Sequence, residues 1–331
     1  MAKTANAVKR FRASGKVQRN MISLLESEGY ARSLVPHSRA VTRLASPHAG
    51  HLNSSTGTAF PATISDPHPS IMAQRPYFEI LDQADTPLGL LCLRRRAVLS
   101  RPGTFVTEIC VGHELLMSSY HIESEQVLAR RALEWHGGKD LRVVVGGLGL
   151  GYTAEAALAT GQVESLEVFE LIPAVIRWLQ EGFVPLSESL SGDSRLRIVQ
   201  GDIFAALGVP REESPREESP RKESPVDAIL IDIDHSPDKP LAAPHQNFYT
   251  VDGLRRASRW LAPDGVLAIW SSSPNPAFSK TLTEAFAQTE IENVEWSNDF
   301  TDTEEVDHIF MARHPCDANA SHNPSPDAPP S

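Results

Sequence analysis

The feature that most constrains the fold is a glycine-rich segment at residues 143–153, with the sequence VVVGGLGLGYT. Three consecutive β-branched residues predict a buried strand, and the glycines that follow predict a tight turn. Residues 154–159 then predict a helix that ends at Gly161. A strand, a glycine turn and a helix form the unit with which an open α/β sheet presents its backbone to a nucleotide. The segment therefore predicts an α/β fold organised around this turn.

The segments that follow continue the alternation of strand and helix. Helical patterns separate most of the apolar strand patterns, as is typical of parallel sheets with helical crossovers. We therefore predict a Rossmann-like, seven-stranded, mostly parallel sheet flanked by helices. The strands are predicted at residues 141–145, 166–170, 195–199, 228–232, 266–270, 294–296 and 308–312, the helices at 154–159, 173–181, 203–207, 251–261 and 278–289, and a turn at 263–265.

A smaller β unit is predicted ahead of this sheet. Residues 77–81, 89–93 and 105–111 are short apolar or alternating segments separated by turn residues, which indicates antiparallel strands. A helix predicted at 123–136 connects them to the larger sheet. We place the domain boundaries accordingly, with a small β domain at 75–120 and a nucleoside-binding domain at 121–313.

Three segments lack a pattern that predicts packing. Residues 1–74 form a basic extension, residues 211–225 repeat the pentapeptides REESP, REESP and RKESP, and residues 314–331 form a tail rich in Pro, Ser and Asn. The repeat has no apolar face that could contribute to a core, and the extension contains one short helical candidate, near residues 17–28. We predict a disordered extension, a solvated low-complexity insertion and a disordered tail.

The composition narrows the class of partner. Residues 1–65 contain nine Lys or Arg against two Glu, so the rest of the chain is more acidic than the net charge of −11 indicates. An acidic body disfavours nucleic acid and tolerates cationic ligands such as amines. No apolar run approaches the roughly 18–20 residues needed to span a membrane. The three cysteines have no metal-ligand or CxxC spacing, so we expect a reducing, cytoplasmic location.

Acidic residues end three successive predicted strands after the glycine turn. Glu170 ends the second strand, Asp202 follows the third, and Asp232 ends the fourth. The carboxyl ends of parallel strands meet at one edge of the sheet, where open α/β proteins bind ligands. A carboxylate in the position of Glu170 can accept both hydroxyls of a ribose, and Asp202 is placed to meet an adenine amino group. Together these acids favour an adenosyl ligand.

At these residues the chain resembles a known family. The order of GGxGxG, the strand ending in Glu170, Gly201-Asp202, the strand ending in Asp232, Phe248-Tyr249 and the segment LAPDGVL at 261–267 is similar to the S-adenosylmethionine-dependent methyltransferase fold. More narrowly, it resembles the spermidine synthase (polyamine aminopropyltransferase) family. That family also has a small β domain ahead of the glycine turn. The resemblance covers residues 77–313.

The resemblance implies roles for individual residues. Gly146, Gly147, Gly149 and Gly151 fall on the family's nucleotide loop, Glu170 on its ribose-binding acid, Asp202 with Ile203 on the adenine site, and Asp232 with Asp234 on the catalytic acids. It also implies decarboxylated S-adenosylmethionine or S-adenosylmethionine as co-substrate, a small-molecule amine as acceptor, polyamine biosynthesis as the context, and a homodimer. A sulfonium is already an activated leaving group, so the protein would position a neutral amine and accept its proton.

Two alternatives depend on departures from the family pattern. The family has an aspartate within the glycine loop, where this chain has Leu148 or Leu150. The family also has two acids after its fourth strand, three residues apart, whereas Asp234 comes two residues after Asp232. These departures favour a methyltransferase that uses S-adenosylmethionine itself, or a non-catalytic member of the same fold.

A metal site is a further alternative for the segment after the fourth strand. Asp232, Asp234 and His235, with His245 nearby in sequence, have ligand types that bind divalent ions. Consecutive residues at a strand end do not all point inward, however. We therefore expect no metal and interpret His235 as a loop histidine.

Overall fold

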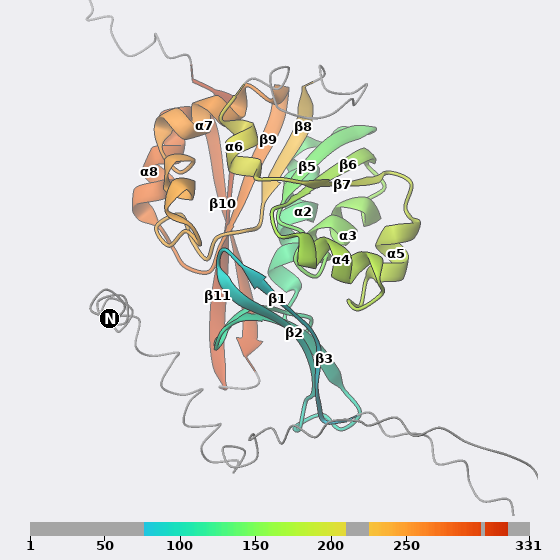
Figure 1. The fold of residues 1–331 in the computed structure, drawn as a ribbon. Coiled ribbons are helices and arrows are strands. Elements are labelled where there is room, and N and C mark those ends of the chain that lie inside the picture. Colours follow the sequence, from blue (N-terminus) through green and yellow to red (C-terminus); the bar gives the residue numbers. More distant parts are fainter. Residues whose placement is uncertain (1–75, 210–224, 299–301, 317–331) are drawn as a thin grey trace, which may run out of the picture. The chain divides into compact units, whose positions relative to one another are not determined.

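The computed structural model describes residues 76–209, 225–298 and 302–316, which form two β-sheets and the helices around them (Figure 1). The predicted extension at 1–74 and the predicted insertion at 211–225, apart from Pro225, lie outside the described residues. The same is true of the predicted tail beyond Cys316. Within the tail's predicted range, His314 and Pro315 belong to a strand, so the order of the chain extends further than we predicted.

The larger sheet has the predicted seven strands and is mostly parallel. Its order is β10-β11-β9-β8-β5-β6-β7, in which β11 runs antiparallel to both of its neighbours. Its strands are β5 (Leu141–Gly146), β6 (Val163–Glu170), β7 (Leu196–Gln200), β8 (Val226–Ile231), β9 (Leu261–Ser271), β10 (Phe286–Asn298) and β11 (Thr303–Pro315). The chain runs outward from β5 to β7 on one side and from β8 onward on the other. The point of reversal, between β5 and β8, is where such sheets open a crevice.

Helices cover both faces of this sheet, and side chains alternate between them. Val143 and Val145 of β5 pack under one group of helices, while Val144 faces the other group. The first group is α2 (Glu123–His136), α3 (Tyr152–Ala159), α4 (Pro173–Gln180) and α5 (Ser187–Gly192); the second is α6 (Ile203–Leu207), α7 (Val251–Ser258) and α8 (Pro276–Ala285). The largest fully buried side chains include Trp178 on one face and Trp260 on the other. Burying a large apolar side chain stabilises the fold by about 1.5–3 kcal/mol.

The smaller sheet is antiparallel and has one strand more than we predicted. Its order is β1-β2-β3-β4, with β1 (Phe78–Thr86), β2 (Gly89–Ala97), β3 (Phe105–Val111) and β4 (Glu114–Ser118). Leu91 and Ile109 pack into the same core as α2 and β5, so the two sheets share one hydrophobic interior. Inside the sheet, Glu108 is 1% exposed and pairs with Arg94 and Arg96 at 2.7 and 2.8 Å.

One predicted helix, two predicted strands and one predicted turn towards the C-terminal end differ from the structure. The helix predicted at 278–289 ends at Ala285, and Phe286 is extended because β10 pairs with β11 over its whole length. The strands predicted at 294–296 and 308–312 are therefore parts of two thirteen-residue strands. The turn predicted at 263–265 is instead an irregularity within β9. In each case long-range pairing overrides the local pattern.

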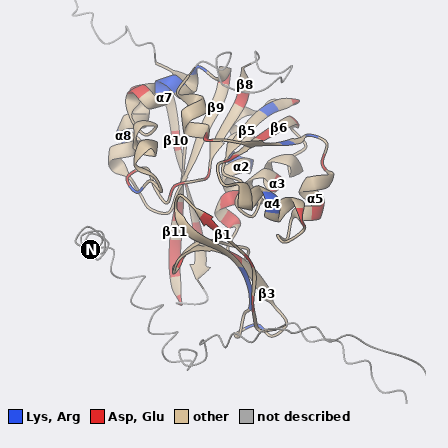
Figure 2. Ribbon diagram, in the orientation of Figure 1, with Lys and Arg blue, Asp and Glu red and all other residues tan. Residues whose placement is uncertain are grey.

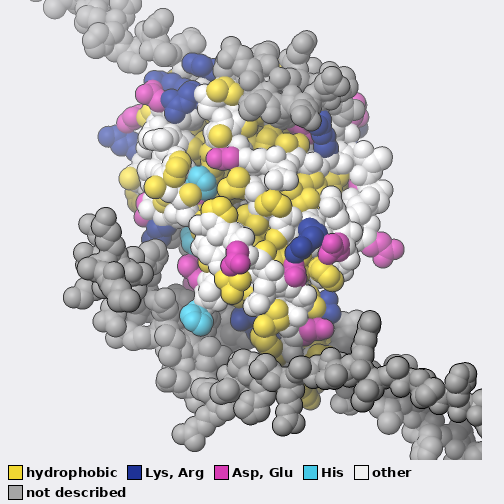
Figure 3. Space-filling model, viewed as in Figure 1, with side chains coloured by type: hydrophobic (Ala, Val, Ile, Leu, Met, Phe, Trp, Pro, Cys, Tyr) yellow, Lys and Arg dark blue, Asp and Glu magenta, His cyan; other side chains and the backbone are white. Residues whose placement is uncertain are grey.

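Charge and apolar side chains are unevenly distributed on the described surface. Acidic residues recur along the hairpin of β10 and β11, whereas Arg255 and Arg256 place positive charge on α7 (Figure 2). Apolar side chains are spread over the face in Figure 3, and among the exposed ones on the small sheet are Phe78, Ile80 and Leu90. No helix among the described residues has the length and apolar character to cross a membrane.

Candidate functional site

The glycine turn lies against the end of the neighbouring strand β8. Gly147, Gly149 and Gly151 all have positive φ, at 95°, 50° and 96°. A side chain on Gly147 would collide with the main-chain oxygen of Asp232. The Asp232 N–H in turn donates to the Gly146 oxygen at 2.9 Å. Gly147 therefore allows the turn and the start of the β8 loop to pack backbone to backbone.

The two leucines of the turn point into the core and leave the glycines to face the cavity. Leu148 is 4% exposed and Leu150 is fully buried, and both pack with the main core. Gly147 and Gly149 line the cavity instead. Met117 of β4 closes over the turn, with its Sδ 3.0 Å from the Leu150 N–H that donates to it. The aspartate position that we assigned to the leucines in sequence is thus not cavity-facing.

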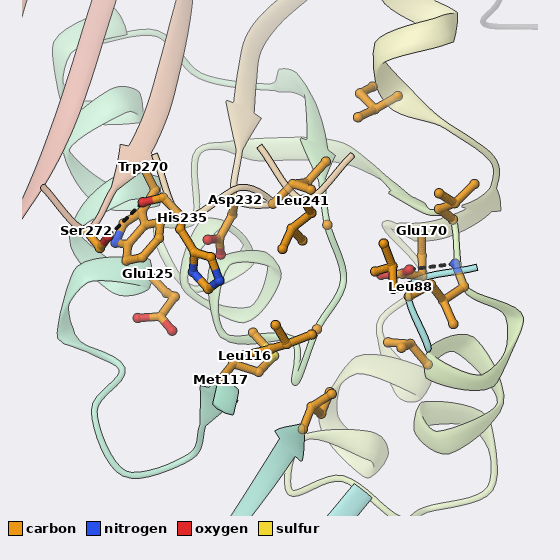
Figure 4. A pocket seen from close by; sticks show the side chains of 18 of the residues that line it. Leu88, Leu116, Met117, Glu125, Glu170, Asp232, His235, Leu241, Trp270 and Ser272 are labelled. Carbon is orange, nitrogen blue, oxygen red and sulfur yellow. Dashed lines mark hydrogen bonds between the residues drawn. The ribbon is translucent and has the colours of Figure 1, made fainter. Parts of the chain in front are cut away.

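A cavity of about 360 Å³ lies at the carboxyl edge of the sheet, between the glycine turn and the small sheet (Figure 4). Among the described residues that line it are six acids and three histidines, but no lysine or arginine: Glu123, Glu125, Glu170, Asp202, Asp232, Asp307, His121, His235 and His245. In the view of Figure 4, Glu125 and Trp270 lie on one side of Asp232, and Glu170 and Leu88 lie on the other.

Glu170 is fixed by backbone donors at one end of the cavity. Its Oε1 accepts a hydrogen bond from the Ile172 N–H at 2.7 Å, and its Oε2 accepts one from the Leu148 N–H at 3.1 Å. Burial raises the pKa of its carboxyl, and these backbone hydrogen bonds partly counteract the rise. The glycine turn and the loop after β6 are therefore tied together through one side chain.

Asp202 and Ile203 lie at the neighbouring strand end. Asp202 caps α6, and its Oδ1 accepts hydrogen bonds from the Phe204 and Ala205 N–H groups at 2.8 and 3.3 Å. Ile203 is 2% exposed and packs beneath Gly146. Both residues line the cavity, so they lie with Glu170 at the same edge of the sheet.

Asp232 lies at the centre of the cavity, directly after β8. Its Oδ2 accepts a hydrogen bond from the Thr153 Oγ1 of α3 at 2.6 Å. Burial raises its pKa to about 6, while the Thr153 hydroxyl lowers it and the charge of Asp307 raises it. A carboxylate with this pKa is mostly ionised at pH 7 and close enough to neutrality to exchange a proton.

Three further acids of the cavity, Glu123, Glu125 and Asp307, were missed in the sequence. Glu125 is on the first turn of α2, where acids are common for reasons of helix stability alone. Burial and the charge of Asp232 raise its pKa to about 8. Asp307 is on β11, where its Oδ2 accepts a hydrogen bond from the Trp296 Nε1 at 3.0 Å, and burial raises its pKa. The one sequence signal was an acid at the edge of the apolar run 308–312.

Asp234 differs from Asp232 in that it does not line the cavity. It is 2% exposed, and it accepts hydrogen bonds from the Leu241 N–H at 2.6 Å and the Tyr249 hydroxyl at 2.8 Å. Its Oδ1 is also 3.0 Å from the His245 Nδ1. Burial and the adjacent Asp234 raise the pKa of Tyr249 well above its usual value. Asp234 therefore anchors the loop after β8 and is separated from the cavity in which Asp232 lies.

His235 lines the cavity as well. Its ring Nε2 lies 3.4 Å from the Glu114 Oε1 of β4, and its main-chain oxygen accepts a hydrogen bond from the Ser272 hydroxyl at 2.8 Å. Within the described residues, no group of three or more His, Cys, Asp or Glu is arranged to hold a metal ion.

Comparisons with known proteins support this fold. No family model matches the chain, and no curated protein matches it in sequence. Among solved structures, a spermidine synthase from Thermotoga maritima matches with a TM-score of 0.53 and 14% identity, over 70% of this chain and 72% of that chain. A spermidine synthase in complex with the transition-state analogue AdoDATO matches with a TM-score of 0.53 and 15% identity, over 70% and 73%.

A human methyltransferase-like protein 13 in complex with SAH matches with a TM-score of 0.42 and 16% identity, over 61% of this chain and 83% of that chain. We base no argument on this weaker match. The two spermidine synthase structures establish the Rossmann-like fold that the sequence predicted, with a mostly parallel seven-stranded sheet and a small antiparallel sheet.

Proposed function

We propose that this protein transfers an aminopropyl group from decarboxylated S-adenosylmethionine to an amine acceptor. The observation that carries the proposal is the charge of the cavity, which six acids line without any lysine or arginine among the described residues. The sulfonium and primary ammonium groups of that donor, and the protonated amine of an acceptor, are all cations. An acidic, partly desolvated cavity favours such ligands electrostatically.

The same charge pattern distinguishes the two possible donors. S-adenosylmethionine carries a carboxylate beside its amino group, and binding it requires a cation or several N–H donors. The decarboxylated donor lacks that group and needs neither. A cavity in which every ionised side chain is an acid therefore favours the decarboxylated donor over S-adenosylmethionine, which remains the alternative.

The nucleoside would bind at the Glu170 end of the cavity. We assign the ribose hydroxyls to Glu170 and the adenine to Asp202 and Ile203, with the glycine turn of Gly147 and Gly149 beneath the sulfonium. The solved spermidine synthase with AdoDATO, which shares the fold, supports an adenosyl ligand in this role. This assignment keeps the sequence prediction for these residues.

Asp232 would act on the acceptor. Its carboxylate lies between the two ends of the cavity, so it can hold the amine in line with the carbon that undergoes transfer (Figure 4). The amine nitrogen forms a bond to that carbon as the carbon–sulfur bond breaks, and the electron pair remains on sulfur as a neutral thioether. Positioning and proton removal are the tasks left to the protein. Asp234 has no part in this step because it lies outside the cavity.

A donor comparison tests the proposal. The purified chain would be incubated with decarboxylated S-adenosylmethionine or with S-adenosylmethionine, each with putrescine, spermidine or spermine, and the nucleoside products separated. We expect 5′-methylthioadenosine from the decarboxylated donor and no S-adenosylhomocysteine from the other. Product from S-adenosylmethionine alone would favour the methyltransferase, and product from neither donor would favour a non-catalytic protein.

A further inference from the structure

We propose that Glu125 accepts the proton of the attacking amine, while Asp232 and Asp307 hold the amine as anions. This inference rests on the proposed function and adds to it a catalytic residue from α2, a helix that precedes the glycine turn. Three acids from α2, the β8 loop and β11 line one cavity, and they divide the two tasks according to the hydrogen bonds that each receives.

The three acids Glu125, Asp232 and Asp307 differ in the hydrogen-bond donors that they receive. Asp232 accepts a 2.6 Å hydrogen bond from the Thr153 hydroxyl, and Asp307 accepts a 3.0 Å hydrogen bond from the Trp296 indole. A donor aimed at a carboxylate favours its ionised form. Glu125 has the Ser124 hydroxyl, at 3.1 Å from its Oε2, and otherwise only its own backbone N–H, so it receives no donor from another element. The proton that three neighbouring carboxylates share is therefore held by Glu125.

Ser124 gives this proton a path between two of the acids. Ser124 is 5% exposed, and its hydroxyl interacts with both Glu125 and Asp307. A hydroxyl has one hydrogen to donate and two lone pairs that accept. When Ser124 donates to Asp307, it can accept a hydrogen bond only from a protonated Glu125. The arrangement thus has a consistent hydrogen-bond network with Glu125 neutral and Asp307 ionised.

The titratable groups around Glu125 come from several elements. Those that line the same cavity nearby are Glu123 on its own helix, His121 before it, Asp232 and His235 after β8, and Asp307 on β11. Tyr152 on α3 interacts with Glu125 without lining the cavity. No lysine or arginine is among the described lining residues, so the charge that would draw the proton off Glu125 has to arrive with a ligand. The buried indole nitrogen of Trp270 lines the same cavity and has no hydrogen-bond partner in the described residues, which also indicates a ligand there.

The proton balance follows from this arrangement. A cationic amine that binds between Asp232 and Asp307 lowers the proton affinity of Glu125, and one proton leaves to solvent. The ionised Glu125 then takes a proton from the ammonium, which frees the lone pair of the nitrogen. That lone pair forms the carbon–nitrogen bond as the carbon–sulfur bond breaks, and the product leaves as a secondary ammonium. Glu125 therefore ends the cycle protonated, as it began, and the one proton released in the net reaction is the proton that left when the amine bound.

The first test measures protons rather than turnover. Protein saturated with 5′-methylthioadenosine would be titrated with spermidine at pH 7.5 in two buffers of different ionisation enthalpy. We expect wild type to release up to about one proton per amine bound, and Glu125→Gln to release almost none, because glutamine has no proton to exchange. Glu134→Gln is the matched control, since Glu134 is on the same helix but is solvent-exposed and paired with Arg131. It should release as many protons as wild type.

The second test separates rate from binding. Glutamine resembles the protonated form of Glu125, so Glu125→Gln should leave KM within about threefold while kcat falls about 10²-fold and its rise with pH disappears. Ser124→Ala should keep most of the activity and shift the midpoint of the pH profile. Equal proton release in wild type and Glu125→Gln, no release in wild type, or an unchanged kcat and pH profile in the variant would each overturn the inference. Absence of any product from the decarboxylated donor would instead overturn the proposed function, and the proton measurement would still decide the role of Glu125.

Discussion

The two ends of the cavity contain the same chemical group in two different settings. At one end, both oxygens of Glu170 accept hydrogen bonds from backbone N–H groups of two loops. At the other end, Asp232 and Asp307 receive hydrogen bonds from side chains, and Glu125 receives them from the Ser124 hydroxyl and its own backbone N–H. The charges of Asp232 and Asp307 raise the pKa of Glu125, and the charge of Asp307 also raises that of Asp232. The first end has donors fixed by the fold. The second has donors that a single substitution can add or remove.

This difference indicates how the site can be divided. Backbone donors suit a group that must be recognised in one fixed orientation, such as a ribose. Clustered carboxylates with adjustable proton affinity suit a group that changes charge during a reaction. The two ends should therefore respond differently to the loss of a carboxylate: one in the affinity for nucleoside, the other in rate and pH dependence.

The largest expected effect belongs to the Asp232 end. Asp232→Asn should lower kcat for aminopropyl transfer by about 10³-fold, because the anion that orients the amine is lost. The affinity for 5′-methylthioadenosine should change by less than about threefold, since the nucleoside end is untouched. Steady-state kinetics and calorimetry would measure the two quantities. A variant that loses both equally would show that the cavity is a single functional unit.

At the other end, Glu170→Gln should weaken 5′-methylthioadenosine binding by about 10–100-fold, because an amide accepts hydrogen bonds with one of its two polar groups only. The kcat at saturating donor should stay within about fivefold of wild type. Glu167→Gln, on the same strand, serves as the control. If Glu170→Gln lowers kcat and leaves the nucleoside affinity intact, the roles of the two ends are reversed.

A substitution at Asp234 tests whether an acid that does not line the cavity affects stability rather than rate or nucleoside affinity. Asp234→Asn should lower the free energy of unfolding by about 2–3 kcal/mol, because it weakens a buried network with Tyr249, His245 and the Leu241 N–H. Denaturant titration would measure the loss, with Tyr249→Phe as a milder change in the same network. The kcat of the remaining folded protein should fall by less than about fivefold. A fall as large as that of Asp232→Asn would place Asp234 in the reaction.

The smallest expected effect is a gain in stability. The pKa of Glu125 is raised from 4.5 to about 8, so between these values the folded protein binds a proton that the unfolded chain has lost. The contribution of Glu125 to the free energy of unfolding is therefore most favourable below about pH 4.5, and it decreases as the pH rises towards 8. Glu125→Gln should remove this decrease and raise the free energy of unfolding at pH 8 by on the order of 2 kcal/mol. If the free energy of unfolding depends equally on pH in wild type and variant, the surroundings of Glu125 do not raise its pKa.

The sequence predicted the parts of the site that local patterns encode. A glycine turn after a strand, and acids at the ends of the next strands, meet because parallel strands place their carboxyl ends at one edge. Glu125 and Asp307 could not be found in this way. They are about 180 residues apart in sequence and share a cavity only because α2 packs against the C-terminal strands.

The structure adds contacts to one sequence prediction and corrects another. The family resemblance grouped Asp234 with Asp232 as catalytic acids, and in the structure Asp234 also accepts hydrogen bonds within the His245 and Tyr249 network. Residues 286–289 were predicted as helix because their pattern continued that of α8, but pairing with β11 determined their conformation. Both depend on contacts with residues distant in sequence, which a local pattern does not contain.

The contact between Met117 and the glycine turn couples the small sheet to the backbone of the turn. A side chain added at Gly149 would overlap the Met117 methyl group and sulfur, which are the flexible end of that side chain and can move aside. The φ of 50° at Gly149 would remain, and it disfavours any residue that has a side chain. A smaller residue in place of Met117 would therefore give space above the turn without making Gly149 replaceable.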